Sequence, residues 1–206
     1  MAQRNEVVEI FKSRKTILEF LEIQGYDTSN YNKDSMSQVS IMLQNEQLDM
    51  LVEKDGKKAY VKYHLGKTLR AANVLEYIED LHDLEKVLEK TDDLIIIMRE
   101  EPNDSLIKEL KNIWEKDRVF VIVHALKRLQ FNIMNHELVP PHRNLNEKEV
   151  VEFKNKYKIT DDKLIPDINR FSPVALALCM RPGEICEIIR PSNTSIETPF
   201  YRVCSP

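Results

Sequence analysis

Cysteine is scarce in this sequence. Its three cysteines, Cys179, Cys186 and Cys204, are odd in number and form no Cys-x-x-Cys pair. Such a set argues against a disulfide framework and against a zinc site. We therefore expect free thiols in a reducing compartment, and neither a metal ion nor another cofactor.

Long hydrophobic runs are missing as well. No stretch approaches the roughly eighteen apolar residues of a membrane-spanning helix, and the first thirty residues are too charged for a secretory signal. We therefore expect no membrane partner.

A surplus of basic residues is the third thing that the sequence lacks. Its 30 Lys and Arg residues face 34 Asp and Glu residues, which gives a formal net charge of −4. From Ile133 onward the counts are ten and ten, so the acidic excess lies in the first part. Strong unassisted DNA binding usually needs a basic face. This composition argues against a stand-alone DNA-binding protein and permits a few local contacts within a larger complex.

Hydrophobic periodicity in the first 132 residues is typical of an α/β domain. The predicted elements in chain order are helix 7–21, strands 41–52 and 59–65 joined by the turn pair Asp55-Gly56, helix 74–88, strand 94–98, a helix opened by residues 102–104, and strand 119–123. Strands 94–98 and 119–123 are apolar throughout and are separated by a helix. This order predicts a parallel pair in an α/β layer.

The last part of the chain has a different pattern. Asn146 with Glu149 forms a capping box that starts a helix, and Ser172-Pro173 starts another through Met180. Residues 185–189 and 200–203 are predicted to form antiparallel strands, joined by a polar loop over residues 192–198. We therefore predict two domains, 1–132 and 133–206, the second a small α/β domain with a short antiparallel sheet.

Residues 136–142 read His-Glu-Leu-Val-Pro-Pro-His. A zinc-protease motif needs two histidines one turn apart on an unbroken helix, whereas here His142 comes six residues after His136, with two prolines between them. Because proline also forces the preceding residue toward extended geometry, we expect a rigid, extended strap. The strap could dock against another surface through Leu138 and Val139, or serve as a stiff linker between two domains.

Residues 132–142 closely resemble the opening of the assembly domain in the fifth-largest subunit shared by the nuclear RNA polymerases, a family that also has an archaeal counterpart. Further blocks match in the same order: residues 164–168 (Leu-Ile-Pro-Asp-Ile), 172–176 (Ser-Pro-Val-Ala-Leu), 181–184 (Arg-Pro-Gly-Glu), 188–190 (Ile-Ile-Arg) and 201–204 (Tyr-Arg-Val-Cys). The resemblance in the first 130 residues is much fainter.

The resemblance implies a non-catalytic subunit of a multisubunit DNA-directed RNA polymerase. Its C-terminal assembly domain is expected to contact the largest subunit and other subunits, and its N-terminal domain to form a jaw beside the downstream DNA duplex. The expected assembly residues are His136, Glu137, Leu138, Val139, Pro140, His142, Pro173 and Arg190. A loop that approaches DNA in the family corresponds here to Pro102, Asn103 and Ser105, with Lys108 on the following helix. The competing interpretation is an ordinary surface loop in which Asp104 caps the helix.

The family's N-terminal domain is also similar in fold to restriction-type nucleases. Those enzymes hold a divalent ion with an Asp on one strand and an acid-x-Lys triplet on the next. Asp49 fits the first position, but the triplet reads Tyr60-Val61-Lys62, with a phenol in place of the second carboxylate. We therefore predict neither a catalytic site nor a metal site.

Two other functions remain open from the sequence: a free-standing regulator that binds polymerase transiently, and a metal-dependent nuclease. The faint N-terminal resemblance beside a closely matching C-terminal domain indicates a divergent lineage, such as a version encoded by a large DNA virus. A viral version would lie in the host cytoplasm and the virion, whereas a cellular one would lie in the nucleus.

Overall fold

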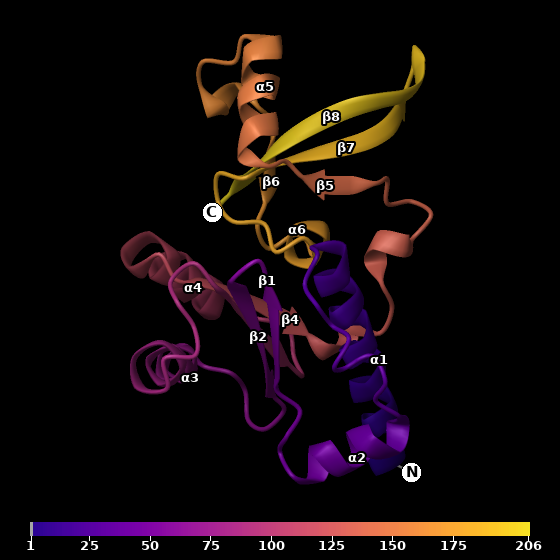
Figure 1. Cartoon of the computed structure of the whole chain (residues 1–206), viewed down its shortest axis with the longest axis vertical. Helices are drawn as coiled ribbons and strands as arrows, with labels where there is room; N and C mark the ends of the chain where they lie inside the picture. The colour runs from indigo at the N-terminus through magenta and orange to yellow at the C-terminus, as the bar shows by residue number, and fades with distance from the viewer. Residues whose placement is uncertain (1) are drawn as a thin grey trace. The chain divides into compact units, whose positions relative to one another are not determined.

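The computed structural model describes residues 2–206, with side chains described from Asn5 onward. The chain divides into two units, Met1–Asn132 and Ile133–Pro206, each with its own four-stranded sheet. The fold is therefore mixed α and β with two sheets (Figure 1).

The first unit alternates helices with the strands of its sheet. Its elements are α1 (Ala2–Ile23), α2 (Met36–Gln44), β1 (Met50–Lys54), β2 (Lys57–His64), α3 (Ala71–Ile78), a π-helical turn (Glu79–Leu84), β3 (Asp93–Met98), α4 (Asp104–Asp117), β4 (Phe120–Ala125) and a 3-10 turn (Leu126–Leu129). The strand order is β1-β2-β3-β4, with β1 antiparallel to β2 and the other pairs parallel.

Both predicted features of this sheet are confirmed. β3 and β4 are parallel and every residue of each is buried, as expected of strands covered on both faces, although β4 lies at the edge of the sheet. Asp55 and Gly56 connect β1 to β2 with φ of 49° and 83°, the geometry of a two-residue hairpin turn. Helices α3 and α4 contact each other and lie on the opposite side of the sheet from α1 (Figure 1). This arrangement agrees with right-handed crossovers between successive parallel strands.

Two predictions for the first unit are wrong in part. Residues 41–52 are not a strand throughout, because α2 occupies Met36–Gln44 and β1 begins only at Met50. Ser35 and Gln38 form a capping box, which is the local signal that starts this helix. The helix predicted over residues 74–88 is α-helical only to Ile78 and continues as the π-helical turn to Leu84.

The second unit contains a 3-10 turn (Ile133–Asn135), β5 (His142–Asn144), α5 (Glu147–Tyr157), a 3-10 turn (Asp162–Leu164), β6 (Asp167–Asn169), α6 (Pro173–Ala177), β7 (Ile185–Ser192) and β8 (Ser195–Ser205). The strand order is β5-β7-β8-β6. The predicted antiparallel pair is confirmed in β7 and β8, but the sheet is mixed because β6 runs parallel to β8.

Two further details of the second unit differ from expectation. The predicted loop over residues 192–198 is mostly strand, since β7 and β8 form one long hairpin that pairs Arg190 with Thr198 and Ser192 with Ser195. Helix α6 ends at Ala177, before the expected Met180, and Cys179 adopts φ of 49°. The capping box at Asn146 and the Ser172 cap are both present.

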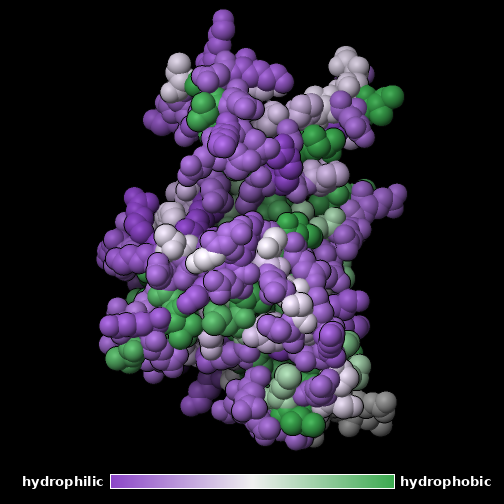
Figure 2. Space-filling model, in the orientation of Figure 1, coloured by the Kyte–Doolittle hydropathy of each residue, from purple (hydrophilic) through white to green (hydrophobic). Residues whose placement is uncertain are grey.

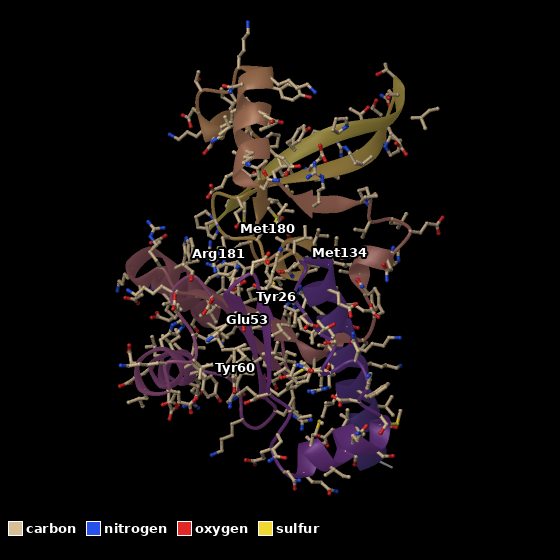
Figure 3. The ribbon with its side chains drawn as sticks, viewed as in Figure 1. Tyr26, Glu53, Tyr60, Met134, Met180 and Arg181 are labelled. Carbon is tan, nitrogen blue, oxygen red and sulfur yellow. The ribbon has the colours of Figure 1, made fainter. Side chains whose placement is uncertain are left out.

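Two apolar clusters hold the second sheet, one on each face. On one face α6 and the turn at residues 133–135 contribute to a cluster that includes Met134 and Met180 (Figure 3). On the other face α5 packs through Phe153, whose ring lies 4.1 Å from the ring of Tyr201. These clusters fix the orientation of the strands that carry two of the expected assembly residues, His142 and Arg190.

Candidate functional site: an edge of the second sheet

The segment that connects the first turn of the second unit to β5 carries most of the predicted assembly residues. It is not extended throughout, which corrects the expectation from its prolines. His136 and Val139 close a turn in which the Val139 amide donates to the His136 carbonyl at 2.9 Å. The chain becomes extended only from Pro140 onward. Proline restricts its own φ and the residue before it, so residues 136–138 remained able to turn.

This turn leaves an apolar side chain at the surface. Leu138 is 83% exposed, whereas Val139 and Pro140 are half-buried. The Leu138 amide donates to Nδ1 of His136 at 3.1 Å, so that nitrogen accepts and His136 is oriented by its own turn. His136 and Glu137 are exposed. An exposed leucine on a hydrogen-bonded turn is suited to inserting into another surface with little ordering cost.

The predicted residues His142 and Arg190 lie on one face of the sheet, near this turn. β5 pairs His142 with Ile188, and the Ile189 amide donates to the Pro141 carbonyl at 3.0 Å. Nδ1 of His142 lies 2.5 Å from the Pro140 carbonyl, so Nδ1 carries the proton. Burial lowers the pKa of His142, and the charge of Arg202 acts in the same direction.

Pro173 lies at the start of α6. It is the exposed first residue of α6, whose start is capped by the Ser172 hydroxyl accepting from the Ala175 amide. Helix α6 contacts the turn at residues 133–135, where the segment begins. The structure therefore brings Pro173, the turn, His142 and Arg190 to one side of the second sheet.

Sequence reasoning missed two residues beside Arg190. Phe200 and Arg202 lie on β8, where Phe200 pairs with Ile188 across the hairpin. The Arg190 guanidinium carbon is 4.0 Å from the centre of the Phe200 ring. The signal was their period-two spacing on the predicted strand, but the expected loop over residues 192–198 left the hairpin register undefined.

The four residues expected near DNA are brought together at the start of α4. Asn103 is the N-cap, and its side-chain oxygen accepts from the Leu106 amide at 2.8 Å. Asp104 is therefore the first helical residue and not the cap, contrary to the competing interpretation. Asn103, Ser105 and Lys108 are exposed, and Pro102 is half-buried. The loop follows β3 at the carboxyl end of the parallel strands, an edge that commonly carries ligand contacts in α/β sheets.

Asp49 lies in a network that occupies its oxygens. Lys62 Nζ contacts Asp49 Oδ2 at 2.6 Å, and the Tyr63 amide donates to Asp49 Oδ1 at 2.9 Å. The Tyr60 hydroxyl lies 3.3 Å from Oδ2, and Figure 3 shows Tyr60 on the side of the sheet that faces α3. Burial and the Asp49 carboxylate together raise the pKa of Tyr60, so its hydroxyl stays protonated.

Lys62 is held as a cation in the same network. Burial alone would lower its pKa, but the hydrogen bond and charge of Asp49 outweigh burial and raise it. An ammonium thus neutralises Asp49 where a divalent ion would otherwise be expected to sit. Among residues 5–206, whose side chains are described, no group of three or more His, Cys, Asp and Glu side chains could hold a metal ion.

Figure 2 shows a mainly hydrophilic face with separate small hydrophobic areas, one of them at the far end of the β7–β8 hairpin, where Ile196 is 90% exposed. Within the described part of the chain, no helix has the length and apolar character needed to span a bilayer.

Comparison with known proteins identifies the family. Residues 131–204 match the domain described as RNA polymerase Rpb5, C-terminal domain. Subunit Rpo5 of the DNA-directed RNA polymerase of Pyrococcus horikoshii is 46% identical over 74 residues, which are 36% of this chain and 89% of that protein. The chain belongs to the Rpb5 family. This membership agrees with the polymerase-subunit function expected from the residue blocks.

Relatives of the Rpb5 family from eukaryotes extend the comparison. The subunit rpabc1 of DNA-directed RNA polymerases I, II and III from Dictyostelium discoideum is 22% identical over 200 residues, 97% of this chain and 98% of that protein. The RPABC1 subunit of Caenorhabditis elegans is 38% identical over 85 residues, 41% of this chain and 40% of that protein. The stronger similarity therefore lies in the second unit, which carries the edge described above.

Proposed function

We propose that this chain is a non-catalytic subunit of a multisubunit DNA-directed RNA polymerase, anchored to the largest subunit through its second unit. The observation that carries the proposal is the coincidence of two facts. The match to the Rpb5 C-terminal domain covers residues 131–204, and two of the predicted assembly residues in that region, His142 and Arg190, lie on one face of its sheet. The exposed turn, His142, Arg190 and Pro173 form the assembly surface in this proposal.

The physical argument for anchoring rests on low ordering cost. Leu138 projects from a hydrogen-bonded turn, and the following residues are tied to β7 by the bond from Ile189 to Pro141. A partner that buries Leu138 gains hydrophobic free energy without having to order a flexible loop. Co-purification tests this role directly. The tagged chain, expressed in its native source, is expected to retain the largest polymerase subunit in equal amount through high-salt washes.

Absence of polymerase subunits from the purified material would contradict the proposal. Sub-stoichiometric recovery that high salt abolishes would instead indicate a free-standing regulator that binds polymerase transiently.

The first unit, in the same proposal, is a jaw of restriction-nuclease-like fold beside the downstream DNA duplex. The capped start of α4 presents backbone amides and a partial positive charge, and Lys108 is exposed one turn further on. Contacts of this kind are weak and independent of sequence, and they suffice when the rest of the complex keeps the jaw near DNA. Photo-cross-linking from position 103 or 105 to a downstream duplex in assembled polymerase tests this role. No cross-link in a transcribing complex would contradict it.

The chain has no active site of its own in this proposal. Lys62 and the Tyr63 amide engage the Asp49 carboxylate, and Tyr60 supplies a phenol, a poor ligand for Mg²⁺. Plasmid DNA incubated with the purified chain and Mg²⁺ or Mn²⁺ is expected to remain supercoiled. Cleavage that Asp49→Ala abolishes would reveal a nuclease.

We also propose that the chain comes from a divergent lineage such as a large DNA virus, which would place it in the host cytoplasm and the virion. The support is the contrast between 46% identity over 74 residues of the second unit region and 22% identity over nearly the whole chain in another relative. Immunofluorescence in the native source distinguishes this from a cellular protein, which would be concentrated in the nucleus.

A further inference from the structure

One face of the β7–β8 hairpin concentrates positive charge. Strand side chains alternate between faces, and the register pairs Cys186 with Arg202, Ile188 with Phe200 and Arg190 with Thr198. Arg190, Phe200 and Arg202 therefore project to the same face. β5 adds His142, which pairs with Ile188. Burial and the charge of Arg202 disfavour the charged form of His142, so we call Arg190, Phe200 and Arg202 the cationic face.

Both guanidinium groups of the cationic face lie against one aromatic ring. The guanidinium carbon of Arg190 is 4.0 Å from the centre of the Phe200 ring, and that of Arg202 is 5.5 Å from it. Arg202 also donates to the main-chain carbonyl of Asp167 at 2.7 Å, which holds its side chain in place. Arg190 is exposed and forms no salt bridge with any residue whose side chain is described. Its charge is thus positioned by the ring but not neutralised.

The carboxylate of Glu187 lies on the face of the sheet opposite the cationic face, where it is already paired. On the opposite face Glu187 accepts from the Tyr201 hydroxyl at 2.9 Å and from Arg143 at 2.8 Å, and Arg143 also pairs with Glu149. No carboxylate lies on the cationic face among the described side chains that the three strands β5, β7 and β8 place there. The residues considered are 142–144, 186–190 and 198–204. Two like charges on one ring repel each other, and an anion bound between or beside them would relieve that repulsion.

We propose that the cationic face binds a carboxylate-bearing segment of a polymerase subunit, with Arg190 pairing with an Asp or Glu side chain of that partner. This inference rests on the proposed function and adds the chemistry of the partner to it. A planar guanidinium fixed against an aromatic ring presents its outer edge in a set orientation, which suits two parallel hydrogen bonds to a carboxylate. Leu138 precedes the start of β5 by four residues, so the same partner can bury an apolar contact next to the ion pair.

The surroundings of Phe200 favour a protein carboxylate over the backbone of a nucleic acid. Phe200 is half-buried and packs against the cluster that contains Cys186 and Ile188, with Arg190 close to its ring. Base stacking needs an open ring face, which this arrangement does not leave for successive nucleotides. The second unit also has equal numbers of basic and acidic residues, ten of each, so it lacks the general positive field of a nucleic-acid surface.

The test compares full-length variants for binding to polymerase core that has been purified from the same source without this chain. Arg190→Glu reverses the charge on the cationic face and is expected to weaken binding at least about tenfold, with the loss greatest at low salt. The matched control, Lys148→Glu, makes the same charge change at an exposed position of α5 outside this face and is expected to bind as the unmodified chain does.

A second variant keeps the charge and identifies the partner group. Arg190→Lys supplies an amine at this position, and a zero-length carbodiimide coupling joins an amine only to a carboxylate in direct contact. The expected product is an amide bond from position 190 to an Asp or Glu of a polymerase subunit, located by mass spectrometry. The control Asn193→Lys places an amine at the hairpin turn, away from the face, and is expected to give no such product.

The outcomes separate the two proposals. If the unmodified chain does not join the core, the proposed function fails and this inference fails with it. If the unmodified chain joins the core, equal binding by Arg190→Glu together with no cross-link from Arg190→Lys overturns the inference alone. Loss of duplex DNA binding by Arg190→Glu, with unchanged binding to core in the absence of DNA, would also overturn it, because the face would then be a nucleic-acid contact.

Discussion

Replacing both apolar residues of the exposed turn tests the anchoring role most sharply. The perturbation is Leu138→Asp together with Val139→Asp. Leu138 is 83% exposed in the chain alone, so a partner that covers it would remove most of the leucine surface from water. Full burial of a leucine side chain contributes roughly 1.5–3 kcal/mol, and the exposed fraction of Leu138 accounts for about 2 kcal/mol of that.

Aspartate at these positions does more than remove the apolar contact. An unpaired carboxylate buried in an apolar interface costs several kcal/mol, so the double variant is expected to lose at least about 4 kcal/mol of binding free energy. That loss corresponds to roughly a thousandfold increase in Kd. Leu138→Ala removes the side chain without adding charge, and we expect it to raise Kd only about tenfold to thirtyfold.

The assay is equilibrium binding of the labelled chain to polymerase core that lacks it. Thermal unfolding provides the folding control. Substitution at the exposed Leu138 is expected to change stability by about 0.5 kcal/mol or less, a shift of roughly 1–2 °C for a chain of this length. Because Val139 is half-buried, the double variant is compared only if its melting temperature stays within that range. Leu84→Asp is the matched control, since Leu84 is 71% exposed and lies in the first unit. A double variant that melts normally and still binds core with unchanged Kd would refute the anchoring role of the turn.

Three further predictions concern the chain by itself. Asp49→Ala leaves Lys62 and the Tyr63 amide without their acceptor and is expected to lower the stability of the first unit by about 2–4 kcal/mol in urea unfolding, whereas Tyr60→Phe, which removes one long hydrogen bond, should cost about 1 kcal/mol or less. Burial lowers the pKa of His124 to about 4, below its value near 6.5 in the unfolded chain. The stability that the neutral His124 contributes is therefore complete above pH 6.5 and is lost as pH falls to about 4, a loss on the order of 3 kcal/mol. His124→Phe should remove this pH dependence, and an unchanged pH slope in that variant would contradict the prediction. The three cysteines are buried, and burial raises the pKa of the Cys204 thiol to about 12, so a thiol reagent should label none of them in the native chain within minutes and all three in guanidinium; rapid native labelling would show that the second unit opens.

Much of the chain was predictable because its signals are local. The capping box at Asn146, the Asp55-Gly56 turn and the apolar runs of β3 and β4 each specify their own structure within a few residues. Helix α2 also has a local signal, the capping box of Ser35 and Gln38. The prediction there was nevertheless a strand, because a short apolar run was given more weight than the capping box. Short apolar runs fit a strand or a buried helix equally well, and only the packing of Val39 into the core decides between them.

The candidate site was likewise predictable only in part. Sequence resemblance indicated His142 and Arg190 as separate members of an assembly surface, and the prolines indicated a rigid segment. The turn at residues 136–139 was not predictable from them, because proline constrains the backbone at and just before itself and leaves earlier residues to the contacts that they make.

The sequence by itself determined the family, the starts of α4, α5 and α6, and the absence of an excess of positive charge. These follow from residue identity and spacing, which act over a few positions along the chain. Only the tertiary structure decided which side chains share a face. Arg190 and Arg202 meet at Phe200 because the hairpin register aligns them, and a shift of one residue would have placed them on opposite faces. In the same way Lys62 neutralises Asp49 because β1 and β2 pair in this register.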